Sequence, residues 1–299
     1  MGYVLLLLAT LAWSFVGVLV KTASAMTDSA VISFARFFFG VVFLGIYLWI
    51  RDGKIQIRLG LAWIWIGAIG KAANYALENF ALKIGFSYGN IVVQPVQTVV
   101  LLFAAALLFK EKITARSWAA AALCVAGVIA VGWNGAPVGE LVHGTGGLTT
   151  LLFTLAGAGA AVHVLSQRIL LKTMDNGSMN LSMFCLSTLV VTIPIPIQSH
   201  GFTGPMTAWA WGALVLLGAI TGLSFFWFAE AIKRVPFAAV AILGNCTVLF
   251  TIVWARLFFR DPITLYLIGG TLLFIAGFLL LNFPRPGRTA RKASIRVES

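Results

Sequence analysis

Two stretches of this chain read almost alike: Phe109-Lys110-Glu111-Lys112-Ile113-Thr114 and, 150 residues later, Phe259-Arg260-Asp261-Pro262-Ile263-Thr264. Paired repeats of this size, in a chain this apolar, are typical of secondary transporters. The repetition predicts two related halves, residues 1–140 and 141–283, followed by a basic tail over residues 284–299. Two shorter matches share the spacing: Ala81-Leu82-Lys83 with Ala231-Ile232-Lys233, and Ala126-Gly127 with Ala276-Gly277.

The composition predicts a membrane protein. Hydrophobic residues make up 60% of the 299 residues and charged residues only 10%, whereas a soluble domain has about 25% charged residues. A net charge of +12 would suggest a nucleic-acid partner if it lay on a polar face. Here the basic residues lie in short loops and in the tail, so we expect contact with membrane lipid and none with nucleic acid.

The cysteines and the N-terminal segment carry no separate signal. All three cysteines lie inside apolar runs with no CxxC or metal-type spacing, so we expect small core residues, no metal site and no cofactor. Residues 1–20 are apolar, and Ala23-Ser24-Ala25 resembles a signal-peptidase site. Because a basic n-region is missing and residues 151–170 form a counterpart one repeat later, the segment is predicted to be a retained first helix.

Ten apolar segments are long enough to cross a bilayer, which takes about 20 residues for a hydrocarbon core of about 30 Å. Five segments fall in each half, and five is odd, so the second half must enter the membrane from the opposite side. The predicted fold class is an all-α membrane protein of ten transmembrane helices, arranged as two inverted five-helix repeats. The expected spans are residues 2–20, 30–50, 60–79, 86–109, 115–133, 148–170, 179–198, 207–231, 236–258 and 263–283.

Lysine and arginine predict the orientation. With the N-terminus inside, the inner loops and the tail hold fifteen of these residues and the outer loops hold four, so both termini are expected in the cytoplasm. The expected location is the bacterial inner membrane. Monomer and homodimer both stay open, because small-residue faces on the fifth and tenth segments permit close packing within one chain or between two.

The repeated residues resemble a known family. Ala81-Leu82-Lys83, ahead of a helix that ends Leu107-Leu108-Phe109-Lys110-Glu111-Lys112-Ile113-Thr114, is similar to the EamA repeat of the drug/metabolite transporter superfamily. Arg36 is similar to the arginine that many members carry on their second helix. The resemblance covers nearly the whole chain, although Asp261-Pro262 stands where the first half has Glu111-Lys112. This departure suggests that the motif is structural.

Within that superfamily, the length and the aromatic-rich interior most resemble the amino-acid exporters, including those for aromatic amino acids. The resemblance implies efflux of amino acids or related small metabolites through a central cavity.

The third segment carries a polar stripe. Lys71, Asn74, Tyr75 and Glu78 are spaced i, i+3, i+4 and i+7, so they share one helix face. Polar side chains in hydrocarbon are costly and usually face protein or a wet cavity. We therefore expect this stripe to point inward.

The fourth segment repeats the pattern with Asn90, Gln94 and Gln97. Pro95 is expected to kink this helix and free the Ile91 carbonyl, which would suit a substrate site.

The predicted substrate site gathers polar and aromatic residues from six segments, several at repeat-equivalent positions. Its members are Trp13, Ser14, Asn74, Tyr75, Glu78, Asn90, Gln94, Gln97, His163, Ser224, Phe225, Phe228 and Asn245. For the amides, hydrogen bonding between helices is an open alternative. For Trp13, Phe225 and Phe228, the alternative is packing against lipid or core, and His163 fits a satisfied core histidine equally well.

Two acids and one arginine are candidates for binding protons or substrate carboxylates during transport. Glu78 and Glu230 are expected near helix ends, partnered by Lys71 or Lys83 and by Lys233 or Arg234, with proton exchange as the alternative. Arg36 is expected to snorkel to the interface, with attraction of a carboxylate as the alternative.

The interpretation is an exporter of small zwitterionic metabolites working by alternating access, with broad drug or metabolite efflux as an alternative. The chain has no Walker motif and no HExxH, which argues against an ATP-driven pump or a metalloprotease. An intramembrane hydrolase with a Ser224–His163 dyad and a scaffolding membrane protein are the remaining alternatives from other classes.

Overall fold

The computed structural model describes residues 2–110, 114–135, 145–193, 195–198, 201–232, 234 and 237–282. Within these ranges, the side chains of residues 105, 109, 197, 198, 229, 232, 237–245, 281 and 282 fall outside the description. The repeated Glu111-Lys112, most of the loop between the halves and the basic tail therefore lie outside the described residues.

The regular secondary structure of the described chain is helical, apart from one isolated bridge between Thr27 and Phe202. Its first half contains α1 (Gly2–Ser14), α2 (Val16–Ser24), α3 (Ser29–Asp52), α4 (Ala62–Ile84), the 3₁₀ helix η1 (Gly89–Val92), α5 (Val93–Phe109) and α6 (Ala115–Trp133). Its second half contains α8 (Thr145–Leu170), α9 (Asn176–Thr192), α10 (Ile195–Gln198), α11 (Ala208–Ile232), α12 (Phe237–Phe259) and α13 (Leu265–Asn282).

Each of the ten expected spans overlaps helical structure in the described chain, with different bounds. Six helical stretches of the described chain are long and apolar enough to cross a membrane, and two more apolar helices are shorter. The outside of the bundle also carries large apolar side chains, such as Trp209 and Leu265, each 84% exposed. Such a surface suits lipid and not water. The chain is a multi-pass membrane protein.

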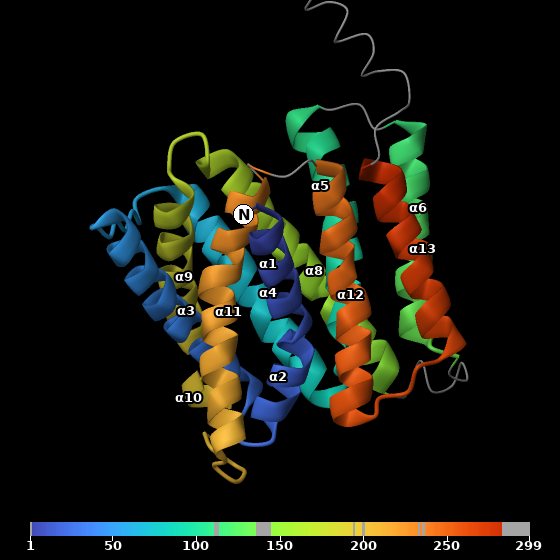
Figure 1. Ribbon diagram of the computed structural model, residues 1–299, viewed down its shortest axis with the longest axis horizontal. Coiled ribbons are helices and arrows are strands. Elements are labelled where there is room, and N and C mark those ends of the chain that lie inside the picture. Colours follow the sequence, from blue (N-terminus) through green and yellow to red (C-terminus); the bar gives the residue numbers. More distant parts are fainter. Residues whose placement is uncertain are drawn as a thin grey trace, which may run out of the picture.

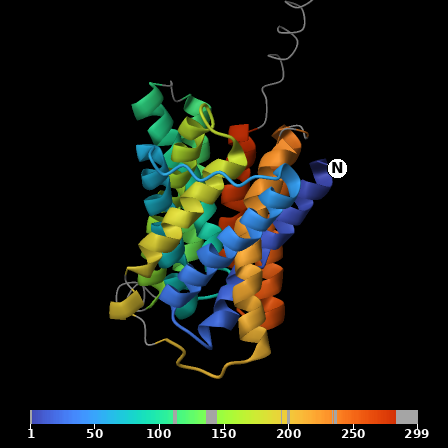
Figure 2. The same ribbon diagram turned by 90° about the vertical axis from the view of Figure 1, so that its left-hand side faces the viewer.

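The helices stand side by side in one bundle (Figures 1 and 2). In Figure 1, α3 and α9 form one edge, α6 and α13 form the other, and α4 and α8 lie between them. Glycines permit close crossings between the halves. A Cβ added to Gly159 of α8 would lie 2.7 Å from the Gly70 carbonyl oxygen of α4, and one on Gly270 of α13 would lie 2.7 Å from that of Gly127 of α6.

Three expected spans are divided in the described chain: 2–20 between α1 and α2, 86–109 between η1 and α5, and 179–198 between α9 and α10. The first breaks at Phe15, between α1 and α2. Side chains of α12 bond to α1 at this break, because the Thr251 hydroxyl donates to the Ser14 carbonyl at 3.2 Å and Trp254 Nε1 donates to Ser14 Oγ at 2.9 Å.

Pro95 was expected to kink a continuous helix over residues 86–109, and this is wrong. The α-helix begins only at Val93, after η1. Pro95 thus lies in the first turn of α5, where its missing N–H breaks no helical hydrogen bond.

Candidate functional site

The polar stripe of α4 is buried in the middle of the bundle. Lys71, Asn74, Tyr75 and Glu78 are each at most 7% exposed. The glycine crossing brings α8 close enough for Asn74 Nδ2 to donate to the Ala156 carbonyl at 3.1 Å. A local helical pattern therefore becomes an internal polar surface between the two halves.

Asn74 links the two charges of the stripe. Lys71 Nζ donates to Asn74 Oδ1 at 3.1 Å, and Asn74 Nδ2 approaches Glu78 Oε2 at 3.4 Å. Glu78 was expected to pair with Lys71 or Lys83 near the interface, and this is wrong. Lys83 pairs with Asp28 at 2.8 Å, and no described cation lies within 4.0 Å of the Glu78 carboxylate. The second acid does pair as expected, because Glu230 lies 3.4 Å from Arg234.

Arg36 does not snorkel to the interface. Its side chain is buried, with Nη1 donating to Asn79 Oδ1 at 2.7 Å and the guanidinium carbon 3.6 Å from the centroid of the Tyr75 ring. Asn79 in turn donates to Ser33 Oγ at 2.8 Å. These partners hold Arg36 inside, but its Nε has no hydrogen-bond partner in the described chain.

Aromatic rings from both halves surround these charges. Lys71 Nζ lies 4.4 Å from the centroid of Tyr75 and 4.6 Å from that of Phe225. Trp13 of α1 packs against Phe225 and Phe228 of α11 at 5.3 and 5.1 Å between ring centroids. Ring faces attract cations, so this wall stabilises the buried ammonium group.

The sequence interpretation missed two members of the aromatic wall. Phe37 stacks on Tyr75 at 4.8 Å, and Phe184 lies 6.0 Å from Phe225. No local signal marks them, because a phenylalanine in an apolar helix looks the same whether it faces lipid or the interior.

His163 and Ser224 lie near the aromatic wall but do not form a dyad. His163 Nδ1 lies 3.1 Å from the Gly67 carbonyl oxygen, and its ring centroid lies 6.1 Å from that of Phe225. In the described part of the chain, His163 Nε2 and Ser224 Oγ are both buried without a hydrogen-bond partner. The nucleophile-to-base hydrogen bond that defines such a dyad is thus not formed between them.

The remaining predicted residues make no described contact with the α4 stripe. Gln94 is exposed and Gln97 half-buried on α5. Asn90 faces α2, where a Cβ on Gly17 would lie 3.4 Å from its Oδ1. Ser14 accepts hydrogen bonds from Thr251 and Trp254 of α12. The Asn245 side chain lies outside the described residues.

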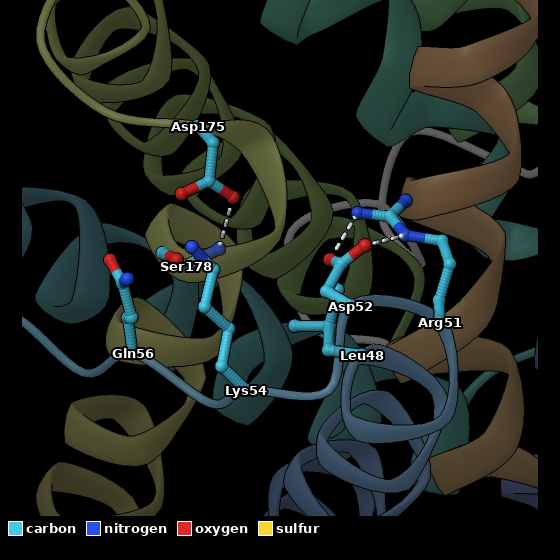
Figure 3. A pocket seen from close by; sticks show the side chains of 7 residues that line it. All are labelled: Leu48, Arg51, Asp52, Lys54, Gln56, Asp175 and Ser178. Atoms are coloured by element: carbon cyan, nitrogen blue, oxygen red, sulfur yellow. Dashed lines mark hydrogen bonds and ion pairs between the residues drawn. The ribbon is translucent and has the colours of Figure 1, made fainter.

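A separate hollow of about 260 Å³ lies at one end of the bundle (Figure 3). Its charges are largely satisfied, because Arg51 pairs with Asp52 at 2.5 Å and Asp175 accepts the Ser178 N–H at 2.9 Å. It therefore differs from the buried centre, whose charges have no ionic partner in the described chain. Its lining residues are Leu48, Arg51, Asp52, Lys54, Gln56, Asp175 and Ser178.

The sequence matches a protein family over both halves. The model of the EamA-like transporter family matches residues 1–133 and 147–283. The chain belongs to the EamA-like transporter family. This confirms the resemblance drawn from its motifs and places the chain in the drug/metabolite transporter superfamily.

Two relatives of this EamA-like transporter are themselves named as transporters. The pseudopaline exporter CntI of Pseudomonas aeruginosa is 26% identical over 278 residues, which cover 92% of this chain and 94% of the relative. The uncharacterized inner membrane transporter YhbE of Escherichia coli is 23% identical over 273 residues, covering 88% and 81%. One crystal structure aligns with a TM-score of 0.62 over 93% of this chain and 96% of its own, at 17% identity, which shows likeness of fold alone.

Proposed function

We propose that this EamA-like transporter exports amino acids or amino-acid-like metabolites across the bacterial inner membrane by alternating access. The observation that carries the proposal is the buried centre, where Lys71, Asn74 and Glu78 meet aromatic rings contributed by both halves. Intramembrane ionisable groups are costly and usually mark a transport path.

The proposed architecture is two inverted five-helix repeats, with both termini in the cytoplasm. Helix contacts support it. When α1–α2 is exchanged with α8, α3 with α9, α4 with α11 and α5 with α12, the contact α4–α8 maps onto α11–α1, and α5–α8 maps onto α12–α1. Under the same exchange, α4–α9 maps onto α11–α3, and α6–α13 maps onto itself.

Antiparallel first helices also support the inversion. Lys21, in the last turn of α2, bonds to the Gly85 carbonyl. A Cβ on the same Gly85 would lie 3.0 Å from Thr149, near the start of α8. The end of α2 and the start of α8 therefore lie at the same end of the bundle.

The charges at the centre match the two ends of an amino acid. Lys71 offers N–H groups to a carboxylate, Glu78 offers an acceptor to an ammonium group, and Asn74 holds the two in place by bonding to both. Trp13, Phe225 and Phe228 would contact the apolar part of the substrate. In this proposal Asn90, Gln94, Gln97 and Asn245 line the route that the substrate follows to and from the centre.

The relatives support export of a small metabolite without deciding its identity. The name pseudopaline exporter belongs to a relative that shares about a quarter of its residues with this chain. From this name we extend to this protein only the export of a small metabolite.

The test is efflux of radiolabelled amino acids, screened one by one, from proteoliposomes holding the purified protein. Asn74→Ala is expected to slow efflux at least tenfold, because it removes a hydrogen bond to charged groups worth about 1.5–3 kcal/mol. Asn180→Ala is the matched control, since Asn180 is equally buried but bonds within α8 and α9, to Gln167 and Asn176. Wild-type efflux by Asn74→Ala would contradict the proposed site.

A further inference from the structure

The buried centre holds more positive than negative charge. Arg36 and Lys71 are both basic and Glu78 is acidic, and all three are at most 7% exposed. Among the described residues, no pair of them lies within the 4.0 Å of an ion pair. Both cations instead lie against one ring, with the Arg36 guanidinium carbon 3.6 Å and Lys71 Nζ 4.4 Å from the Tyr75 centroid.

The protein's own groups satisfy these cations only in part. A guanidinium has five N–H donors and an ammonium has three. One bond from each is described, to Asn79 Oδ1 and Asn74 Oδ1 respectively, and Arg36 Nε is buried without a partner in the described chain. Cation–ring attraction is weaker than the cost of removing an ion from water. The arrangement therefore favours an anionic group supplied from outside the chain.

We propose that Arg36 and Lys71 together bind a carboxylate of the substrate, and that their excess positive charge selects substrates carrying more carboxylates than amines. This inference rests on the proposed function and names its substrate class. A planar carboxylate matches the fork of a guanidinium, and Glu78, linked to Lys71 through Asn74, receives the ammonium group. A neutral amino acid leaves one buried cation unpaired, so it binds more weakly.

Binding is tested on the purified protein in detergent, by the thermal unfolding midpoint as a function of added ligand. Glutamate, glutamine and 1,4-diaminobutane are the probes, because the first two share a skeleton and differ by one carboxylate. Glutamate is expected to reach half-maximal stabilisation at a concentration at least tenfold below that of glutamine, and the diamine is expected to give no shift. Equal effects of glutamate and glutamine, stabilisation by the diamine, or no shift with any probe would overturn the proposal.

Charge variants separate ligand recognition from a structural role. Lys71→Met leaves Arg36 and Glu78, which together are neutral, so the preference is expected to move from glutamate to glutamine. Lys71→Arg keeps the charge and is expected to keep the preference for glutamate. Glu78→Gln removes the acceptor for the amine, so succinate is expected to bind at least as tightly as glutamate. Lys172→Gln is the control, because Lys172 is exposed at the end of α8 and its loss should leave every preference unchanged.

If Lys71 and Glu78 had only a structural role, every variant would weaken the binding of all probes by the same factor. That result would contradict the proposal. If Lys71→Met does not fold, Lys71→Arg and Glu78→Gln still distinguish recognition of the ligand charge from a purely structural role. Counterflow in proteoliposomes then separates this inference from the proposed function. Transport of amino acids without any carboxylate preference refutes the charge selection only, whereas carboxylate binding without transport of any probe refutes the exporter only.

Discussion

Asp175 shows how one side chain begins a helix at the end of the bundle. It is the N-cap of α9, and its carboxylate accepts the backbone N–H of Ser178 at 2.9 Å. Burial raises the pKa of this carboxyl, but hydrogen bonds from the Ser178 backbone and hydroxyl and from the Gly177 backbone outweigh burial, so the pKa lies below its ordinary value of 3.8. Folding therefore favours the ionised form.

A pH-dependent loss of stability follows for Asp175→Ala. Removing an N-cap costs about 1 kcal/mol, and this contribution requires the ionised carboxylate. Because the folded pKa is lowered, the contribution is complete above pH 3.8 and disappears as the pH falls through the folded value. The difference in unfolding temperature between wild type and variant should be smaller at pH 3 than at pH 7, because the contribution begins to be lost below pH 3.8.

Thr114→Ala is the control for this prediction. Thr114 caps α6 through a neutral hydroxyl that accepts the Ser117 N–H at 3.2 Å. Its loss should lower the unfolding temperature equally at both pH values. An Asp175→Ala difference that is also the same at pH 7 and pH 3 would show that the carboxylate charge plays no part.

At the scale of the helices, α4 and α8 can approach closely because Gly70 and Gly159 have no side chains at their crossing. A Cβ on Gly159 would lie 2.7 Å from the Gly70 carbonyl oxygen and 3.0 Å from the Asn74 backbone nitrogen. Both distances are to backbone atoms, so the helices themselves would have to move apart. The crossing thereby positions Asn74 as well as packing the bundle.

Gly159→Ala is therefore expected to destabilise the protein. Overpacking costs about 1–3 kcal/mol, more than the gain of about 1 kcal/mol that alanine brings to a helix. Gly212→Ala is the matched control, because a Cβ there meets no atom within 4 Å and only the gain remains. Thermal unfolding in detergent should show opposite shifts for the two variants; a higher midpoint for Gly159→Ala would mean that α4 and α8 do not cross this closely.

At the scale of the whole molecule, loops of both halves are joined at the lower end in Figure 1. The Asp261 carboxylate accepts the Ser87 N–H at 2.8 Å and its hydroxyl at 2.6 Å. Nearby, Thr27 donates to the Gly201 carbonyl at 2.8 Å, and the Met26 carbonyl accepts the Thr203 N–H at 3.1 Å. Each of these contacts joins one residue of the first half to one of the second half, so together they close this end of the bundle.

Asp261→Ala should loosen this end of the transporter. The measurement is the labelling rate of a cysteine placed at Ser224, which is fully buried, in a variant without Cys124, Cys185 and Cys246. In the proposed orientation, with both termini in the cytoplasm, this end faces outward, so a membrane-impermeant maleimide added to intact cells should react severalfold faster in Asp261→Ala. Asp52→Asn, at the opposite end of the bundle, should leave the rate unchanged. Equal labelling with and without Asp261 would exclude a closing role for the contact with Ser87.

The sequence by itself determined the properties that depend on neighbouring residues. Composition and hydropathy predicted a membrane protein and the positions of its helices, because lipid requires an apolar run of about 20 residues whatever the tertiary structure. The 3.6-residue period placed Lys71, Asn74, Tyr75 and Glu78 on one face of one helix. The repeated motifs led to the family that the comparisons then confirmed.

Only the tertiary structure decided which helix meets that face and which charges lie against it. Arg36 is buried because α3 brings it to Asn79 and Tyr75 of α4, a contact between residues 43 positions apart in the chain. The break at Phe15 accompanies contacts with α12, more than 230 residues away. Such contacts depend on how helices cross, and helical periodicity shows which side chains share a face but not what that face meets.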